Sequence, residues 1–214
     1  MNVFIAGGSS NLGRSVIKVF KDRGDSVTAT FCTKAPGTDV HWIQMDVTDP
    51  DSVTRAFEAV DRIDCLINLF GVFTEDVRDW EKVFDINVAG LYRTIEAARP
   101  HLHSQSSIIN TASINAFHPG FGNTAHYDAS KGAVAAYTIS LAGELAPIRV
   151  NALAPGLIDA AYLHSTDLEV YYKSRAKLGR LVGAEELAHA CTFLCDNKAI
   201  TGQVVVVDCG FLIG

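Results

Sequence analysis

The sequence predicts an α/β fold in which a doubly wound parallel sheet carries helices on both faces. Short apolar runs of strand length alternate with longer segments of helical periodicity along the 214 residues, as strand–helix–strand units require. Some runs are apolar at every position, such as the VVVV of residues 204–207, which indicates burial on both faces of a parallel sheet. Right-handed crossovers then place helices on both sides.

The elements follow in order from these patterns. A cap followed by a proline, Thr48-Asp49-Pro50, marks the start of the second helix. The predicted strands cover residues 3–6, 26–31, 42–45, 65–69, 107–110, 148–152 and 204–207, and the predicted helices cover residues 12–23, 50–60, 76–100, 127–146 and 184–195.

Two segments depart from the alternation. Pro36 and Gly37 follow the second strand and interrupt any helix, so a loop is expected to replace that crossover helix. The segment 159–182 is polar and aromatic without a clear period and follows the carboxyl end of a strand, where open α/β sheets bind ligands. A substrate lid and a plain pair of helices are both open alternatives for it.

Composition narrows the class of protein. A formal net charge of −6 disfavours nucleic acid and anionic membranes as partners, and no apolar run reaches the roughly 18 residues of a transmembrane span. Met1 leads almost directly into the first strand, which leaves no room for a signal peptide. The five cysteines are scattered and odd in number, which favours a reducing cytoplasm. The histidines show no zinc-ligand spacing, so no metal site is expected.

Tyr127 and Lys131 are four residues apart on a predicted helix and therefore share a face. A free tyrosine has a pKa of about 10, and a neighbouring ammonium lowers it by favouring the phenolate. The pair is thus a candidate proton donor and acceptor near neutral pH.

Residues 6–13 read AGGSSNLG, and they lie between the first strand and the first helix. Glycines permit positive φ and a close approach of the backbone to a pyrophosphate. The start of a helix adds amide donors and a favourable dipole. At this position the turn predicts a dinucleotide site.

These features resemble the short-chain dehydrogenase/reductase family along nearly the whole chain. The turn of that family, T-G-x-x-x-G-(I/L)-G, is matched by Gly7 and Gly13, with Ala6 for the threonine and Asn11 for the middle glycine. Asparagine tolerates left-handed backbone better than most residues, so the turn is expected to keep its function. The resemblance implies a single Rossmann-type dinucleotide-binding catalytic domain over 1–214.

Four further segments carry the resemblance. Asp46-Val47 resembles the pair that meets adenine, and Asn68-Leu69-Phe70-Gly71 resembles N-N-A-G. Pro155-Gly156-Leu157-Ile158 resembles the segment that touches the nicotinamide, with Ala160 in place of a threonine, and Asp208-Cys209-Gly210 resembles D-G-G. The expected cofactor-binding residues are Gly7, Ser9, Ser10, Asn11, Leu12, Gly13, Cys32, Lys34, Asp46, Val47, Asn68, Gly71, Tyr127, Lys131, Pro155, Gly156 and Ile158.

The end of the second strand bears on the choice of cofactor. A carboxylate about 20 residues after the glycine turn binds the ribose 2′-hydroxyl of NAD, but Cys32 stands there and no acid follows until Asp39. A 2′-phosphate would fit and could pair with Lys34 or Arg14, unless both cations are merely exposed. NADP(H) is therefore the preferred cofactor and NAD(H) the lesser option.

By the resemblance, the catalytic residues are Asn87, Ser113, Tyr127 and Lys131. Tyr127 would exchange the proton with the reacting oxygen, and Ser113 would hydrogen-bond that oxygen as charge develops on it. Lys131 would lower the pKa of Tyr127 and hold the nicotinamide ribose, and Asn87 would hold a water that links Lys131 to solvent. The cofactor supplies the hydride.

A substrate wall is expected around this tetrad, although packing in the core is the alternative for each of its members. His126, beside Tyr127, is expected to be a solvated histidine at the helix start. The candidates for the wall are Phe117, His118, Phe121, His126, Leu157 and Tyr162.

The sequence thus predicts a cytoplasmic NAD(P)(H)-dependent oxidoreductase that interconverts a carbonyl and a secondary alcohol of a small molecule. One alternative is a catalytically silent NAD(P)-binding sensor, favoured by the departures at Asn11, Leu69, Ala160 and Cys209 but disfavoured by the intact tetrad. Another is a nucleotide-sugar epimerase or dehydratase, which usually needs a larger substrate domain. The resemblance also implies a homodimer or homotetramer built on the helices near 76–100 and 127–146.

Overall fold

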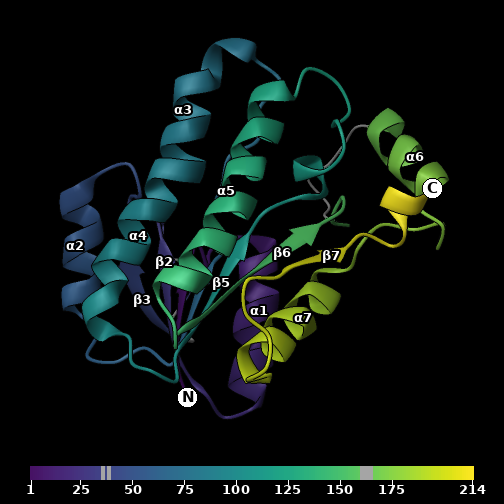
Figure 1. The fold of residues 1–214 in the computed structure, drawn as a ribbon. Helices are drawn as coiled ribbons and strands as arrows, with labels where there is room; N and C mark the ends of the chain where they lie inside the picture. The colour runs from purple at the N-terminus through teal and green to yellow at the C-terminus, as the bar shows by residue number, and fades with distance from the viewer. Residues whose placement is uncertain (35–36, 38–39, 160–165) are drawn as a thin grey trace.

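The computed structural model describes residues 1–34, 37, 40–159 and 166–214. In these residues seven strands form one sheet of order β3-β2-β1-β4-β5-β6-β7, and every neighbouring pair is parallel (Figure 1). The predicted fold class is confirmed. The strands are β1 Asn2–Ala6, β2 Ser26–Phe31, β3 His41–Gln44, β4 Cys65–Asn68, β5 Ser107–Thr111, β6 Arg149–Pro155 and β7 Val204–Val207.

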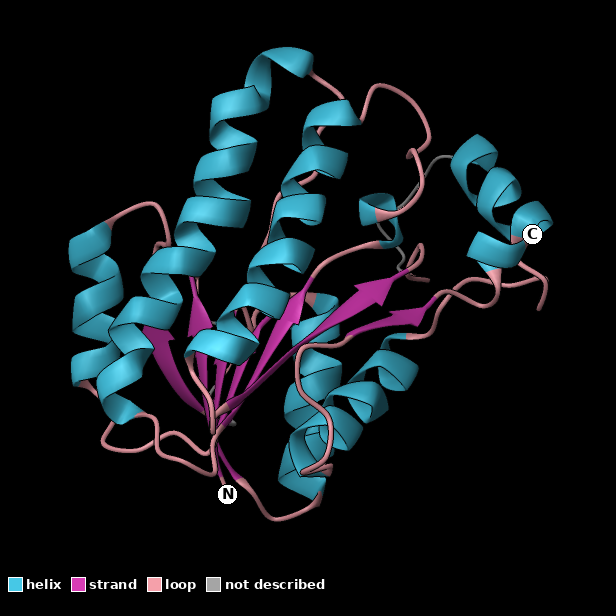
Figure 2. Cartoon of the chain, viewed as in Figure 1, coloured by secondary structure: helices cyan, strands magenta, loops and turns pink. Residues whose placement is uncertain are grey.

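Helices cover both faces of the sheet, as Figure 2 shows. One buried apolar cluster lies under α1 and α7, and the other lies under α2, α4 and α5. The strands between them are buried on both sides because each face is covered. The helices are α1 Asn11–Asp22, α2 Pro50–Glu58, α3 Trp80–Phe84, α4 Gly90–Ala98, α5 Ala125–Glu144, α6 Thr166–Arg175 and α7 Ala184–Asp196.

The predicted helix 76–100 is helical throughout most of its length but not regular. A 3₁₀ turn, Val77–Asp79, precedes α3, and a π-helical turn, Asp85–Ala89, joins α3 to α4. Such π-turns insert an extra residue and occur often at functional sites. Gly90 follows directly, and a Cβ there would lie 2.9 Å from Val47 Cγ2. The missing side chain lets α4 approach the segment after β3.

The structure differs between the two segments that depart from the strand–helix alternation, the connection from β2 to β3 and residues 159–182. Between β2 and β3 the described residues 32–34, 37 and 40 contain no helix, as predicted; Pro36 and Asp39 lie outside the described residues. In the segment 159–182 the described part holds one helix, α6, rather than a pair, followed by a bridge between Ile158 and Val182. The lid stays a prediction.

Within the described ranges, none of the helices combines the length and the apolar character that crossing a membrane requires. The same residues contain no group of three or more His, Cys, Asp or Glu side chains placed to share a metal ion.

The half-buried Arg149 connects the amino end of β6 with the end of α7. Its Nη1 donates to the carbonyl of Leu194 at 2.7 Å and to that of Ile200 at 3.4 Å, and its Nη2 donates to Cys195 O at 2.6 Å. The last carbonyls of a helix have no partner within the helix, and a cationic side chain is a favourable donor to them. Arg149 therefore holds α7 against the sheet.

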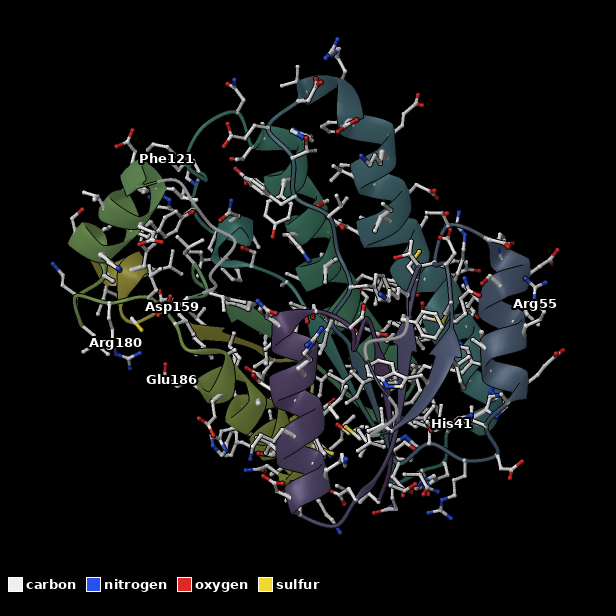
Figure 3. The ribbon with its side chains drawn as sticks, turned by 180° about the vertical axis from the view of Figure 1, so that it is seen from behind. His41, Arg55, Phe121, Asp159, Arg180 and Glu186 are labelled. Carbon is white, nitrogen blue, oxygen red and sulfur yellow. The ribbon has the colours of Figure 1, made fainter. Side chains whose placement is uncertain are left out.

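We predict that Arg149→Met lowers the free energy of unfolding by about 3 kcal/mol, because the carbonyls of Leu194 and Cys195 at the end of α7 lose this charged donor. Chemical denaturation of the purified variant measures the change. Arg55→Met is the control, since Arg55 lies on the outer surface of α2 (Figure 3) and makes one long ion pair of 3.7 Å. Its loss should cost less than about 0.5 kcal/mol. Equal effects of the two substitutions would contradict the role of Arg149.

Candidate active site

The carboxyl ends of four strands, β1, β4, β5 and β6, open into one pocket of about 590 Å³. This is the edge at which the strand order reverses, between β1 and β4, and open α/β sheets bind ligands there. The pocket is lined by Ser10, Asn11, Leu12, Leu69, Phe70, Gly71, Val72, Phe73, Thr111, Ala112, Ser113, Ile114, Asn115, Phe121, Tyr127, Lys131, Pro155, Gly156, Leu157, Ile158, Leu168 and Tyr172.

The glycine turn lies at one end of this pocket. Gly7 has a φ of +83°, and a Cβ on it would lie 2.7 Å from the backbone nitrogen of Phe70. A Cβ on Gly13 would lie 2.4 Å from Gly8 O. Ser10 caps α1 by accepting a hydrogen bond from Gly13 N at 3.0 Å. Both glycines are required by close packing, and the start of α1 faces the pocket.

The left-handed backbone considered for Asn11 is not observed. Asn11 is the first residue of α1, and among the described non-glycine residues only Cys209 has a positive φ. Its tolerance of left-handed backbone is therefore not used. Because the helix begins one residue earlier than expected, position 11 already has helical geometry.

Several of the expected cofactor residues lie away from the pocket lining. Asn68 is buried and donates through Nδ2 to Asn110 Oδ1 at 2.9 Å. Thr48 donates to the Asp46 carboxylate first through Oγ1 and then through its backbone nitrogen, and these hydrogen bonds lower the pKa of that carboxyl group. Cys32 and Lys34 are exposed beyond β2. The expected residues outside the lining are Gly7, Ser9, Gly13, Cys32, Lys34, Asp46, Val47 and Asn68.

Lys131 lies on the floor of the pocket with only 4% of its surface exposed. Its Nζ donates to Thr111 O at 2.8 Å and lies 5.8 Å from the centre of the Tyr127 ring. Burial lowers the pKa of Lys131 from 10.5 to about 8. Gly71 provides the space, since a Cβ there would lie 3.2 Å from Nζ.

Asn87 lies in the π-helical turn and is buried. Its Oδ1 accepts from Val72 N at 2.8 Å, and its Nδ2 donates to Val72 O and to Ser130 Oγ, both at 3.0 Å. The side chain thus holds the segment after β4 against α5. It is not part of the pocket lining.

Ser113 and Tyr127 both line the pocket. Ser113 follows β5, and its Oγ accepts from Asn115 N at 3.2 Å. Tyr127 is half-buried in the first turn of α5, where its ring meets that of Phe73 edge-on with centroids 5.1 Å apart. The pocket therefore brings together three of the four predicted catalytic residues, with Asn87 behind them.

Only part of the predicted substrate wall lies at the pocket. Phe121, which Figure 3 shows close to α6, and Leu157 line the pocket. Phe117 and His118 do not: Phe117 is exposed, and the ring of His118 meets Phe211 edge-on at 5.4 Å. Tyr162 lies outside the described residues.

His126 is a second correction, because it is buried rather than solvated. α5 begins at Ala125, so position 126 is already helical and is rotated about 100° from the pocket-facing Tyr127. Among the described residues its Nε2 has no hydrogen-bond partner.

Other residues of the pocket lining were not predicted from the sequence. Phe73 stands two residues after Gly71, and Asn115 stands two residues after Ser113; their proximity to predicted site residues was the available signal. Leu168 and Tyr172 come from α6, whose sequence lacks a clear period, so no pattern indicated them.

Comparisons with known proteins agree on one family. A family model described as enoyl-(acyl carrier protein) reductase matches residues 6–212. The chain is 30% identical to the 3-oxoacyl-(acyl-carrier-protein) reductase FabG of Aquifex aeolicus, over 96% of this chain and 95% of that protein. Its fold is similar to that of the ligand-free aldohexose dehydrogenase of Thermoplasma acidophilum (26% identity, TM-score 0.90, covering 100% and 94% of the two chains). It is also similar to that of a Tyr-to-Phe variant of ElxO with NADPH bound (26% identity, TM-score 0.88, covering 100% and 99%).

We predict that Lys131→Met raises the free energy of unfolding by about 2 kcal/mol at pH 7. The lowered pKa corresponds to a cost of about 3 kcal/mol for the buried charge, and losing the bond to Thr111 offsets about 1 of it. Below pH 8 the wild type bears this cost in full, since Lys131 is protonated both folded and unfolded. Between pH 8 and 10.5 the unfolded chain binds the extra proton, so wild-type stability rises relative to the variant.

Urea denaturation of both proteins from pH 6 to 10.5 measures this difference. The advantage of the variant should shrink above pH 8, whereas Lys198→Met, at an exposed position, should show no such trend. A constant difference across the range would contradict the buried charge.

Proposed function

Since this chain belongs to the short-chain dehydrogenase/reductase family of oxidoreductases, we propose that it interconverts a carbonyl and a secondary alcohol with NADP(H) and uses Tyr127 as general acid and base. One observation carries the proposal. Tyr127, Ser113 and Lys131 share a single pocket with the start of α1, so a bound dinucleotide and a reacting carbonyl would meet there. The whole chain would act as one catalytic domain in the cytoplasm.

The residues present fit a dinucleotide. Gly7 and Gly13 allow the close packing of the glycine turn. Ser10, Asn11 and Leu12 at the start of α1 line the pocket, where the first amides of the helix would receive a pyrophosphate. Lys131 would hold the nicotinamide ribose, and the segment from Pro155 to Ile158 would face the nicotinamide. When bound, the cofactor supplies or accepts the hydride.

The protein groups handle the proton and the developing charge. In the reducing direction the phenol of Tyr127 gives its proton to the carbonyl oxygen, and in the oxidising direction the phenolate takes it from the alcohol. The Ser113 hydroxyl donates a hydrogen bond to the same oxygen and stabilises its negative charge. The ammonium of Lys131 favours the phenolate of Tyr127. Asn87 would hold a water between Lys131 and solvent.

The preference for NADP(H) rests on the end of β2. Cys32 is neutral and exposed there, Lys34 is an exposed cation two residues further on, and Arg14 is an exposed cation in the first turn of α1. A 2′-phosphate would meet no carboxylate at position 32 and could find counter-charges in these two cations. ElxO, with a similar fold, is described with NADPH bound, which agrees with this preference.

The wall of the pocket favours an uncharged substrate. Among the described residues that line the pocket, Lys131 provides the only ammonium and none carries a carboxylate. Apolar walls with few polar groups suit small apolar ligands. We therefore propose an uncharged carbonyl compound; the 3-oxoacyl group named for the Aquifex relative is one candidate. The active form would be a homodimer or homotetramer built on α3–α4 and α5.

We predict that Tyr127→Phe lowers kcat by about 10³-fold because the proton donor is lost, while NADPH still binds. Fluorescence titration gives the affinity, and turnover on a panel of carbonyl compounds gives kcat. Tyr137→Phe on the same helix, outside the pocket lining, should change neither. If wild type binds neither NADPH nor NADH, the enzyme function is refuted; if Tyr127→Phe keeps full turnover, another group carries the proton.

Lys34→Ala tests the cofactor preference separately. Removing this ammonium should weaken NADPH binding by about 10-fold, since a charge-assisted contact to the 2′-phosphate disappears, and should leave NADH binding unchanged. Titration with both nucleotides measures this. Equal changes for the two nucleotides would exclude Lys34 from recognising the phosphate.

A further inference from the structure

The carboxylate of Asp128, one residue after Tyr127, collects three hydrogen bonds from a single loop. Asn115 Nδ2 donates to its Oδ1 at 2.6 Å, and Gly120 N and Thr124 Oγ1 donate to its Oδ2 at 3.0 and 3.1 Å. Bonds to an ionised acceptor are stronger than neutral ones. Asp128 therefore fixes residues 115–124 relative to the helix that carries Tyr127.

This arrangement sets the direction of the Asn115 amide. An amide oxygen and a carboxylate are both acceptors, so Nδ2 must face Asp128 and Oδ1 must face away from it. Oδ1 lies 3.4 Å from Ser113 Oγ and accepts from its hydroxyl, while Asn115 N donates to the same Oγ at 3.2 Å. One residue thus holds the Ser113 hydroxyl through both a donor and an acceptor.

The space around the groups that bond to Asp128 is closely filled. A Cβ at Gly120 would lie 2.3 Å from Asn115 Nδ2 and 2.4 Å from Thr124 Oγ1. Asn115 has only 9% of its surface exposed, yet it lines the pocket. The absence of a side chain at position 120 lets the loop close on the amide, which restricts its rotation.

We propose that Asn115 is a positioning residue for the Ser113 hydroxyl and that Asp128 determines which way its amide points. The inference rests on the proposed role of Ser113. Before substrate binds, the hydroxyl proton is directed at Asn115 Oδ1 through a long hydrogen bond, which is easily exchanged for a shorter one to a substrate oxygen. The backbone bond from Asn115 N keeps Oγ in place during the exchange, so little reorganisation accompanies the reaction.

A double-mutant cycle between Asn115→Ala and Ser113→Ala tests this role. Asn115→Ala should lower kcat about 10-fold and leave the NADPH dissociation constant unchanged. In the Ser113→Ala background the same substitution should lower kcat by less than about 2-fold, because the group it positions is already absent. Equal fold losses in the two backgrounds would overturn the inference.

Exchanging the side chains of Asn115 and Asp128 provides the second measurement. Asn115→Asp places a carboxylate against Asp128 and should lower kcat more than Asn115→Ala does. Combining it with Asp128→Asn reverses donor and acceptor and leaves an oxygen facing Ser113, so kcat should return to within about 3-fold of wild type. No recovery in a double variant that folds and binds NADPH would overturn the pairing.

Asn151→Ala controls for general loss of a buried amide. Asn151 is buried in β6 and bonds to Ile200 O and Gln203 N, so its loss should lower Tm and spare kcat.

Full activity of Ser113→Ala would refute the proposed catalytic role of Ser113 and the inference with it. A strongly lowered but measurable kcat for Ser113→Ala, with an equal fold loss for Asn115→Ala in both backgrounds, would refute the inference alone.

Discussion

The buried ammonium of Lys131 is the constraint on which the pocket depends. Burying a charged side chain with only 4% of its surface exposed is unfavourable in free energy. The hydrogen bond to Thr111 O partly offsets this, and the missing side chain of Gly71 leaves the space for the ammonium. Thr111 Oγ1 in turn donates to Asn68 O at 2.7 Å, so the residue whose carbonyl accepts from Lys131 also joins β5 to the end of β4. The burial of Lys131 thus fixes α5 against the two strands that form the floor of the pocket.

Amide side chains extend this support beneath the site. Asn68 donates to Asn110, and Asn110 Nδ2 donates to Thr138 Oγ1 at 3.0 Å, which connects β4, β5 and α5 through buried polar groups. Asn87 connects the segment after β4 with Ser130 in the same way. Buried polar groups that lose a partner are costly, so each bond specifies one register between its elements. These directional hydrogen bonds hold the floor of the pocket in addition to the apolar packing around it.

The departures from the family pattern differ in their structural consequences. At Asn11 the helix has already begun, so the larger side chain causes no backbone strain. Cys209 adopts a φ of 54°, a conformation that glycine reaches at lower cost, and its Sγ is 3.5 Å from Leu181 O. Leu69 is buried at the edge of the pocket. Of these three, only Cys209 carries backbone strain, and it lies outside the pocket lining.

The sequence by itself determined the succession of strands and helices along the chain, the doubly wound class of the sheet, the glycine turn and the Tyr127–Lys131 pair. Hydrophobic periodicity, glycine placement and helical spacing are local properties of the chain, so they can be recognised without the fold. Tertiary structure decided what each residue meets. It placed His126 inside and Phe117 outside, although both were assigned to one wall, because small rotations along a helix or loop reverse which side is covered. It also brought Asn115 and Asp128 together and added Leu168 and Tyr172 from α6. Contacts between distant segments leave no periodic signal, so only the folded chain could show them.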